Sequence, residues 1–101
     1  MAYYLQLMVL TDKGRRNFAD DPEWIKALDK EIENLGGKIL TQYGLLGQYD
    51  FVNIIEAPSD EVAAKIAIRL SATGTVQPMT LAAISLDKLI SALREEPRTP
   101  W

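Results

Sequence analysis

The chain has 101 residues, of which 48% are hydrophobic and 25% are charged, and it carries a formal net charge of −3. These values are typical of one globular domain spanning residues 1–101, and the negative charge argues against binding nucleic acid through its phosphates. The sequence contains neither cysteine nor histidine, which excludes disulfides, thiolate nucleophiles and the commonest metal ligand. We therefore expect no metal site, no cofactor and no nucleic-acid partner.

The amino-terminal stretch is apolar, but it lacks the basic leader and the small-residue cleavage site of a signal peptide. No apolar run approaches the roughly 18 residues of a membrane span. We expect a cytoplasmic protein without a membrane partner.

The first half of the chain predicts a strand, a helix and a second strand. Residues 3–10 are rich in aromatic and aliphatic side chains, as strands are. Thr11 and Asp12 suit a turn or a helix start, although Gly14 weakens a regular helix there. A stronger start lies at Asp21-Pro22, and apolar side chains then recur at helical spacing. These are Ile25, Leu28, Ile32 and Leu35.

Glycines mark the next boundaries. Gly36-Gly37 ends the first secure helix, with the first glycine in the left-handed conformation. Residues 38–43 and 49–56 read as two strands of a hairpin, because a glycine-bounded segment, Gly44 to Gly47, connects them.

The second half predicts another helix and strand. Pro58-Ser59-Asp60 caps a helix over residues 61–72, and residues 76–85 form a fourth strand in which Pro78 favours an edge position or a bulge. A short helix follows from Leu86, and residues 97–101 form a tail. The order predicts an α+β, ferredoxin-like βαββαβ fold: two helices over one face of a four-stranded antiparallel sheet, plus a short C-terminal helix.

Side chains alternate between the two faces of a strand, which divides the first and third strands into two sets. We expect the helices to cover the uniformly apolar set: Tyr3, Leu5, Leu7, Val9, Val52 and Ile54. The other set then forms the uncovered face: Tyr4, Gln6, Met8, Leu10, Phe51, Asn53 and Ile55. The faces of the second and fourth strands stay undecided.

Such an apolar face is rarely exposed on a monomer. Either the terminal helix folds over it or a second copy packs against it, and we favour a homo-oligomer, a dimer or higher, through the sheet face. The helix over residues 61–72 supports this, because Ala64 and Ile68 add apolar groups away from its core side.

The sequence resembles the GYD domain family in a series of pieces that runs from about residue 10 to residue 90. They are Leu10-Thr11-Asp12 with Gly14, Gly36-Gly37, Tyr43, Leu46-Gly47-Gln48-Tyr49-Asp50, Glu56-Ala57-Pro58 with Asp60, Gly74, and Thr80-Leu81 with Ala83. The resemblance implies a ferredoxin-like fold of the dimeric α/β-barrel type. Members of the family often carry an arginine after the Thr-Leu pair, where this chain has Ala82.

The candidate ligand-binding residues are Gln6, Tyr43, Tyr49, Asp50 and Asn53. Gln6 and Asn53 are amides that must find partners if buried: they line a wet cavity or pair with each other across adjacent strands. Tyr43 either lines the same cavity or holds the two strands of the hairpin together by packing. Tyr49 and Asp50 offer a hydrogen-bond donor and a base, but we favour a structural role in which Asp50 accepts bonds from turn amides.

Two functions from different classes fit these residues. The first is an oligomeric module that binds a small molecule or a protein partner. The second is a cofactor-independent enzyme, an oxygenase or isomerase acting on an apolar or aromatic small molecule, which rests on analogy with other dimeric α/β-barrel proteins. An enzyme should show a closed pocket beside a titratable group with a displaced pKa, for which Asp50 and the tyrosines are candidates.

Overall fold

A computed structural model describes residues 1–95 of the chain. The elements are β1 (Ala2–Leu10), α1 (Asp12–Asp20), the 3₁₀ helix η1 (Pro22–Trp24), α2 (Ile25–Asn34), β2 (Lys38–Gly44), β3 (Phe51–Ala57), α3 (Asp60–Ala72), β4 (Val76–Ala83) and α4 (Leu86–Arg94). The predicted ferredoxin-like order of strands and helices is confirmed, with α1 added before α2. The predicted tail at residues 97–101 lies outside the described residues.

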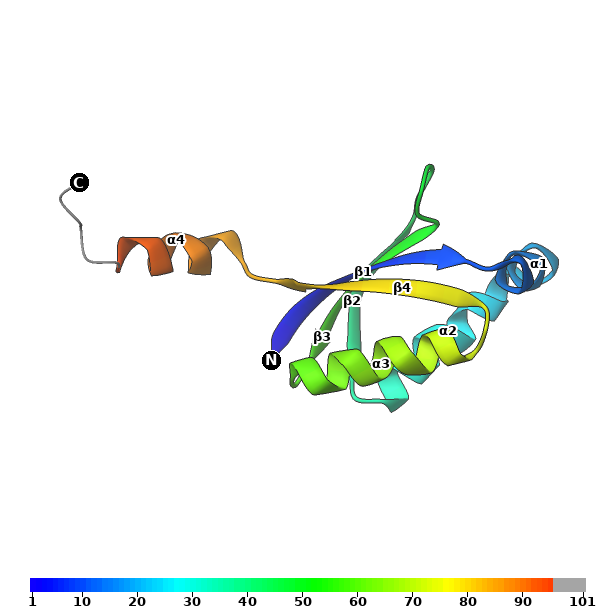
Figure 1. Cartoon of the computed structure of the whole chain (residues 1–101), viewed down its shortest axis with the longest axis horizontal. Helices are drawn as coiled ribbons and strands as arrows, with labels where there is room; N and C mark the ends of the chain where they lie inside the picture. Colours follow the sequence, from blue (N-terminus) through cyan, green and yellow to red (C-terminus); the bar gives the residue numbers. More distant parts are fainter. Residues whose placement is uncertain (96–101) are drawn as a thin grey trace.

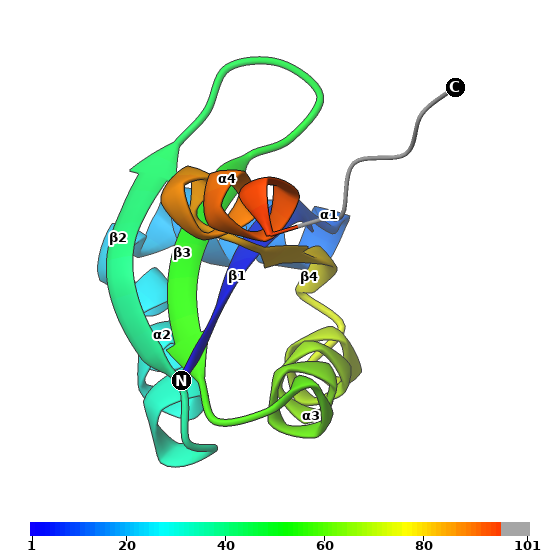
Figure 2. The ribbon, with the colours of Figure 1, turned by 90° about the vertical axis from the view of Figure 1, so that its left-hand side faces the viewer.

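The four strands form one antiparallel sheet in the order β2-β3-β1-β4. Helices α2 and α3 lie on the same side of this sheet, and the opposite side is left open (Figures 1 and 2). β4 lies at one edge of the strand order. This agrees with the edge position that Pro78 favoured, because a proline has no backbone N–H to donate to a second neighbouring strand. Within residues 1–95 the sheet is open and does not close on itself.

A close backbone contact explains one glycine, and a left-handed backbone conformation explains another. Gly14 lies within α1, where a Cβ atom would stand 2.0 Å from the carbonyl oxygen of Thr75. The amide of Thr11 donates to that same oxygen at 2.9 Å, so a glycine lets α1 lie against the start of β4. Gly36 follows α2 with φ of +103°, which confirms the predicted left-handed cap.

The assignment of the sheet faces was wrong. Tyr4, Met8 and Leu10 of β1 are buried, as are Phe51 and Ile55 of β3, so this set faces the helices. The ring of Phe51 meets that of Phe18 edge to face, with centroids 5.2 Å apart. Both sets on β1 are apolar apart from one glutamine, so hydropathy alone does not choose between them. Gln6 and Asn53 suggested a wetter face, but both side chains are fully buried.

The uncovered face, here called the open sheet face, carries the other set. It consists of Tyr3, Leu5, Leu7, Val9, Val52 and Ile54 with Tyr43, Met79 and Leu81 from the edge strands. The edge-strand residues are exposed, Tyr43 to 60%, Met79 to 48% and Leu81 to 44%. The expectation of an apolar uncovered face therefore holds, although different residues form it.

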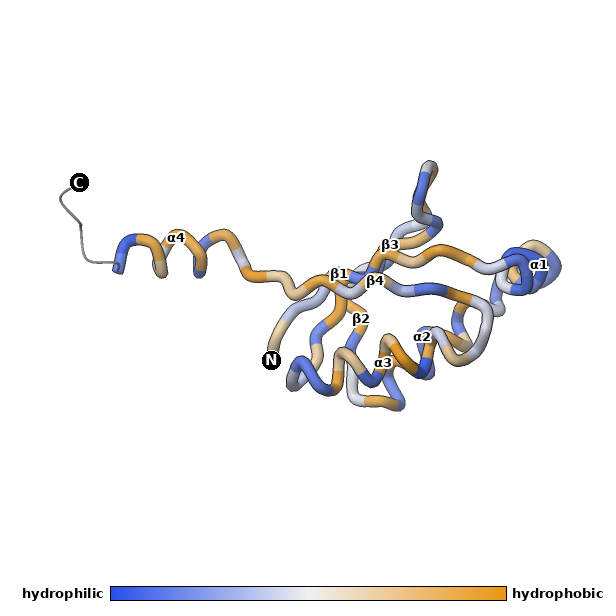
Figure 3. Tube along the Cα trace, viewed as in Figure 1, coloured by the Kyte–Doolittle hydropathy of each residue, from blue (hydrophilic) through white to orange (hydrophobic). Residues whose placement is uncertain are grey.

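The terminal helix does not fold over this face. α4 continues beyond the end of β4 and points away from the domain (Figure 1), and none of its residues is buried. Its hydrophobic positions are visible along the projecting helix (Figure 3). The first of the two interpretations of the uncovered face, cover by the chain's own last helix, is thus not what the structure shows.

The corrected faces predict opposite effects for two substitutions. Phe51→Asp should unfold the domain, because a carboxylate would replace a ring that is 8% exposed in the core, at a cost on the order of 3–5 kcal/mol. Leu81→Asp, on the open sheet face, should keep the fold. Circular dichroism and urea unfolding measure both, and a folded Phe51→Asp protein would contradict the face assignment.

Candidate functional site

A row of polar side chains crosses the helix-covered face of the sheet, one from each strand. Gln42, Asn53, Gln6 and Thr80 are register partners from β2 to β4. The Gln42 amide nitrogen donates to Asn53 Oδ1 at 2.7 Å and to Asp29 Oδ1 of α2 at 2.8 Å. On the other side, Gln6 Nε2 donates to Thr80 Oγ1 at 3.3 Å. These contacts place a polar line inside an otherwise apolar core.

The row is interrupted between its two central residues. Gln6 Oε1 and Asn53 Nδ2 are both buried and have no hydrogen-bond partner among the described residues. One is an acceptor and the other a donor, and their residues stand directly opposite each other. A buried polar atom without a partner costs about 1–3 kcal/mol, so these two atoms are the least satisfied part of the polar row.

Tyr4 forms a second polar contact two residues before Gln6 on the same face. Its hydroxyl donates to Asp60 Oδ1 at 2.5 Å, at the start of α3. The hydrogen bond to this carboxylate, reinforced by burial and by the negative charges of Asp60 and Glu61, raises the pKa of Tyr4 to about 12. Tyr4 is therefore protonated at neutral pH and acts as a hydrogen-bond donor rather than a base.

A surface pocket of about 230 Å³ opens beside this contact. It is lined by Tyr4, Asp60, Ala63, Ala64, Thr80 and Ala82. Thr80 connects the pocket to the polar row, because its hydroxyl receives the Gln6 hydrogen bond. Ala82 is the position where the family resemblance leads one to expect arginine, so a methyl group forms this part of the wall.

The structure brings two of the five predicted site residues together. Gln6 and Asn53 are neighbours within the helix-covered core. Asp50 lies at the hairpin end, where its Oδ2 accepts from the amide of Leu10 at 2.8 Å, so the donor is the last residue of β1 rather than an amide of its own turn. Tyr43 and Tyr49 are also separate from the pair: Tyr43 is on the open sheet face and the Tyr49 hydroxyl lies 3.9 Å from Met79 Sδ.

Sequence reasoning missed the other members of the site. Gln42 and Thr80 belong to strands whose faces were left undecided, and Asp29 lies on a helix. Tyr4 and Asp60 are far apart in the chain. The available signal was that each strand contains an uncharged polar residue, but β2 and β4 contain two each, so the row can be identified only when the register of all four strands is known.

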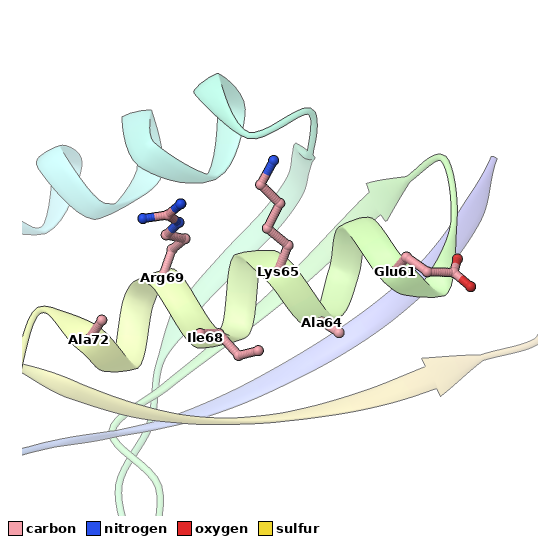
Figure 4. A pocket seen from close by; sticks show the side chains of 6 residues that line it. All are labelled: Glu61, Ala64, Lys65, Ile68, Arg69 and Ala72. Atoms are coloured by element: carbon pink, nitrogen blue, oxygen red, sulfur yellow. The ribbon is translucent and has the colours of Figure 1, made fainter.

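A separate apolar groove runs along the outer side of α3 (Figure 4). It has a volume of about 530 Å³ and is lined by Glu61, Ala64, Lys65, Ile68, Arg69 and Ala72. Ile68 is 66% exposed, while Lys65 and Arg69 project from the helix on the same side as each other (Figure 4). The predicted second apolar side of this helix is confirmed.

Residues 1–95 contain neither a metal-binding cluster nor a membrane-spanning helix. No group of three or more carboxylates is placed to hold a metal ion within that range. Nor does the range contain a helix that is both long and apolar enough to cross a membrane.

Comparison with known proteins identifies the family. The model of the GYD domain family matches residues 4–93. The chain belongs to the GYD domain family. A GYD relative from Thermus thermophilus, named "Glutamine synthetase and cystathionine beta-lyase binding protein", is 38% identical over 95 residues, which cover 93% of this chain and 100% of the relative. The resemblance to the GYD domain family inferred from the sequence is confirmed.

The Tyr4 contact of the GYD domain predicts a specific dependence of stability on pH. Unfolded tyrosine ionises near pH 10 and folded Tyr4 near 12, so the unfolded chain loses a proton that the folded chain keeps. The stabilisation is complete below about pH 10 and falls as the pH rises toward 12. Tyr4→Phe removes this contribution. Urea unfolding measures the stability of both proteins at about pH 9 and about pH 11. Between these two values the unmodified protein should lose more stability than Tyr4→Phe does. Equal losses in the two proteins would contradict the assignment.

Proposed function

We propose that this GYD domain is a protein-binding module whose partner is an enzyme, a glutamine synthetase or a cystathionine β-lyase. The support from relatives is the Thermus thermophilus protein, whose whole length aligns with this chain and whose name states that it binds both enzymes. A domain of this size with neither cysteine nor histidine has few catalytic side chains, which also favours binding over catalysis.

The observation that carries the proposal is the α3 groove. Its apolar floor includes Ile68, which is 66% exposed and is not needed to complete the core. Lys65 and Arg69 add positive charge at one side. An enzyme surface with an apolar side chain flanked by carboxylates would complement this groove, because interfaces combine a desolvated apolar centre with a charged rim.

We also propose that the module works as a homo-oligomer, a dimer or higher, through the open sheet face. A contiguous apolar surface spanning four strands is unusual on a monomer, and the described part of the chain does not cover it. Packing of two such faces is the arrangement that the dimeric α/β-barrel resemblance implies. It leaves the α3 groove free, because α3 lies on the other side of the sheet (Figure 2).

A second candidate function is the binding of a small polar molecule within the domain. The observation that favours it is the buried pair Gln6 Oε1 and Asn53 Nδ2, each lacking a hydrogen-bond partner among the described residues. Thr80 joins Gln6 to the pocket beside Tyr4 and Asp60. Because Tyr4 is held protonated, the pocket suits holding a ligand by hydrogen bonds. Native mass spectrometry of the purified protein should show a co-purified adduct, which Gln6→Leu removes; its absence would reject this function.

The enzyme-binding proposal predicts a local effect on α3. Ile68→Asp should weaken binding to glutamine synthetase or cystathionine β-lyase by about 2 kcal/mol, roughly thirtyfold, without changing the fold. Ala27→Asp, an exposed alanine on α2, is the matched control and should leave binding unchanged. Biolayer interferometry with each enzyme from the same organism measures both variants.

Two results would contradict the proposal in different ways. If neither enzyme binds the unmodified protein at micromolar concentration, the partner is wrong. If an enzyme binds but Ile68→Asp and Ala27→Asp behave alike, the partner stands and the α3 groove is not its docking surface.

A further inference from the structure

Helix α4 lacks the packing that a helix of its length requires. It has nine residues and none of them is buried, whereas isolated helices shorter than about 12–15 residues are marginal in water. Its large apolar side chains recur at helical spacing, as on a helix that packs against a surface. They are Leu86, Leu89, Ile90 and Leu93, exposed to 69%, 44%, 37% and 59%.

The same domain offers α4 no nearby surface. Only Ile84 and Ser85 separate the end of β4 from the helix, and Ser85 caps it by accepting from the amide of Lys88 at 3.2 Å. The helix therefore begins at once and leads away from the sheet (Figure 1). Among residues 1–95 no surface lies against its apolar side, which leaves a second molecule as the occupant to consider.

The β2–β3 hairpin, toward the opposite end of the sheet from α4, also exposes apolar side chains that nothing in the described chain covers. Its segment 43–49 exposes Tyr43 to 60%, Leu45 to 38% and Leu46 to 104%, and it contains no charged residue. The hairpin rises from the sheet on the side away from α2 and α3, as the two views agree (Figures 1 and 2). It therefore projects on the side of the open sheet face.

A two-fold arrangement brings these two features together. In Figure 1 the hairpin and α4 lie toward opposite ends of the sheet, so stacking two open sheet faces about a two-fold axis that reverses this long direction would turn the hairpin end of one copy toward the α4 end of the other. The same contact then occurs at both ends, as an isologous interface requires. The uncharged hairpin can be buried there without leaving a charge unpaired.

We propose that α4 of one copy packs its apolar side against the β2–β3 hairpin of a second copy, and reciprocally. This inference rests on the proposed homo-oligomer through the open sheet face. It adds the segment that holds the two copies together beyond the sheet, and it gives both α4 and the hairpin tip a reason to be apolar.

Cysteine cross-linking tests the contact directly, because the sequence contains no cysteine. Two single variants, Leu46→Cys and Ile90→Cys, are mixed at a concentration where the protein is oligomeric and then oxidised. The expected product is a covalent heterodimer joining the two variants. The matched control replaces Ile90→Cys with Lys88→Cys, two residues away on α4, and should yield much less of this product.

A double-mutant cycle gives a second readout. Leu46→Ala and Leu89→Ala should each weaken self-association by about tenfold, and the double variant should lose less than the product of the two effects, because both remove one shared contact without adding a charge. Sedimentation velocity measures the association, and circular dichroism verifies the fold of each variant.

The possible failures are distinguishable. An oligomer with no preferred Leu46–Ile90 cross-link, or with fully multiplicative effects, overturns the α4–hairpin contact and leaves the sheet-face assembly standing. A protein that is monomeric at all concentrations overturns both the assembly and this inference. Binding of Ile68→Asp to the enzymes is measured separately, so the enzyme-binding proposal stands or falls by itself.

Discussion

The whole arrangement depends on the alternation of side chains along β1, the central strand that pairs with both β3 and β4. Successive residues of a strand point to opposite faces, and on β1 both faces are apolar. The two helices α2 and α3 cover only one of them (Figure 2). Residues 1–95 therefore bury one of the two apolar faces of the central strand and leave the other uncovered, which is the basis of the proposed assembly.

The covered half determines the polar row that forms the candidate site. The helices bury Tyr4, Met8 and Leu10, and the same alternation buries Gln6 between them. Antiparallel pairing then sets Gln6 opposite Asn53 and Thr80, so the register of the sheet builds the polar row. The uncovered half determines the proposed assembly, and the outer side of α3, which faces away from the sheet, is the surface proposed to bind an enzyme.

Local chemistry made much of the fold predictable. Pro22, Gly36 and Ser59 mark helix ends through properties of single residues, and their predicted boundaries agree with the structure. The choice of covered face was not predictable in this way, because it depends on which of two apolar sets packs better against α2 and α3. Gln6 misled the assignment, since a polar residue in a strand suggests solvent unless its partner is known. That partner, Thr80, lies 74 residues away.

The most direct test of the account is whether the open sheet face becomes covered by self-association. Leu81→Cys places a single thiol on that face, where the leucine is 44% exposed, and Lys65→Cys places one on α3 as a control. The rate of alkylation of each thiol is measured over a range of protein concentrations. The account predicts that the Leu81→Cys thiol becomes protected as the concentration rises while the Lys65→Cys thiol does not. Equal, concentration-independent rates at both positions would contradict it.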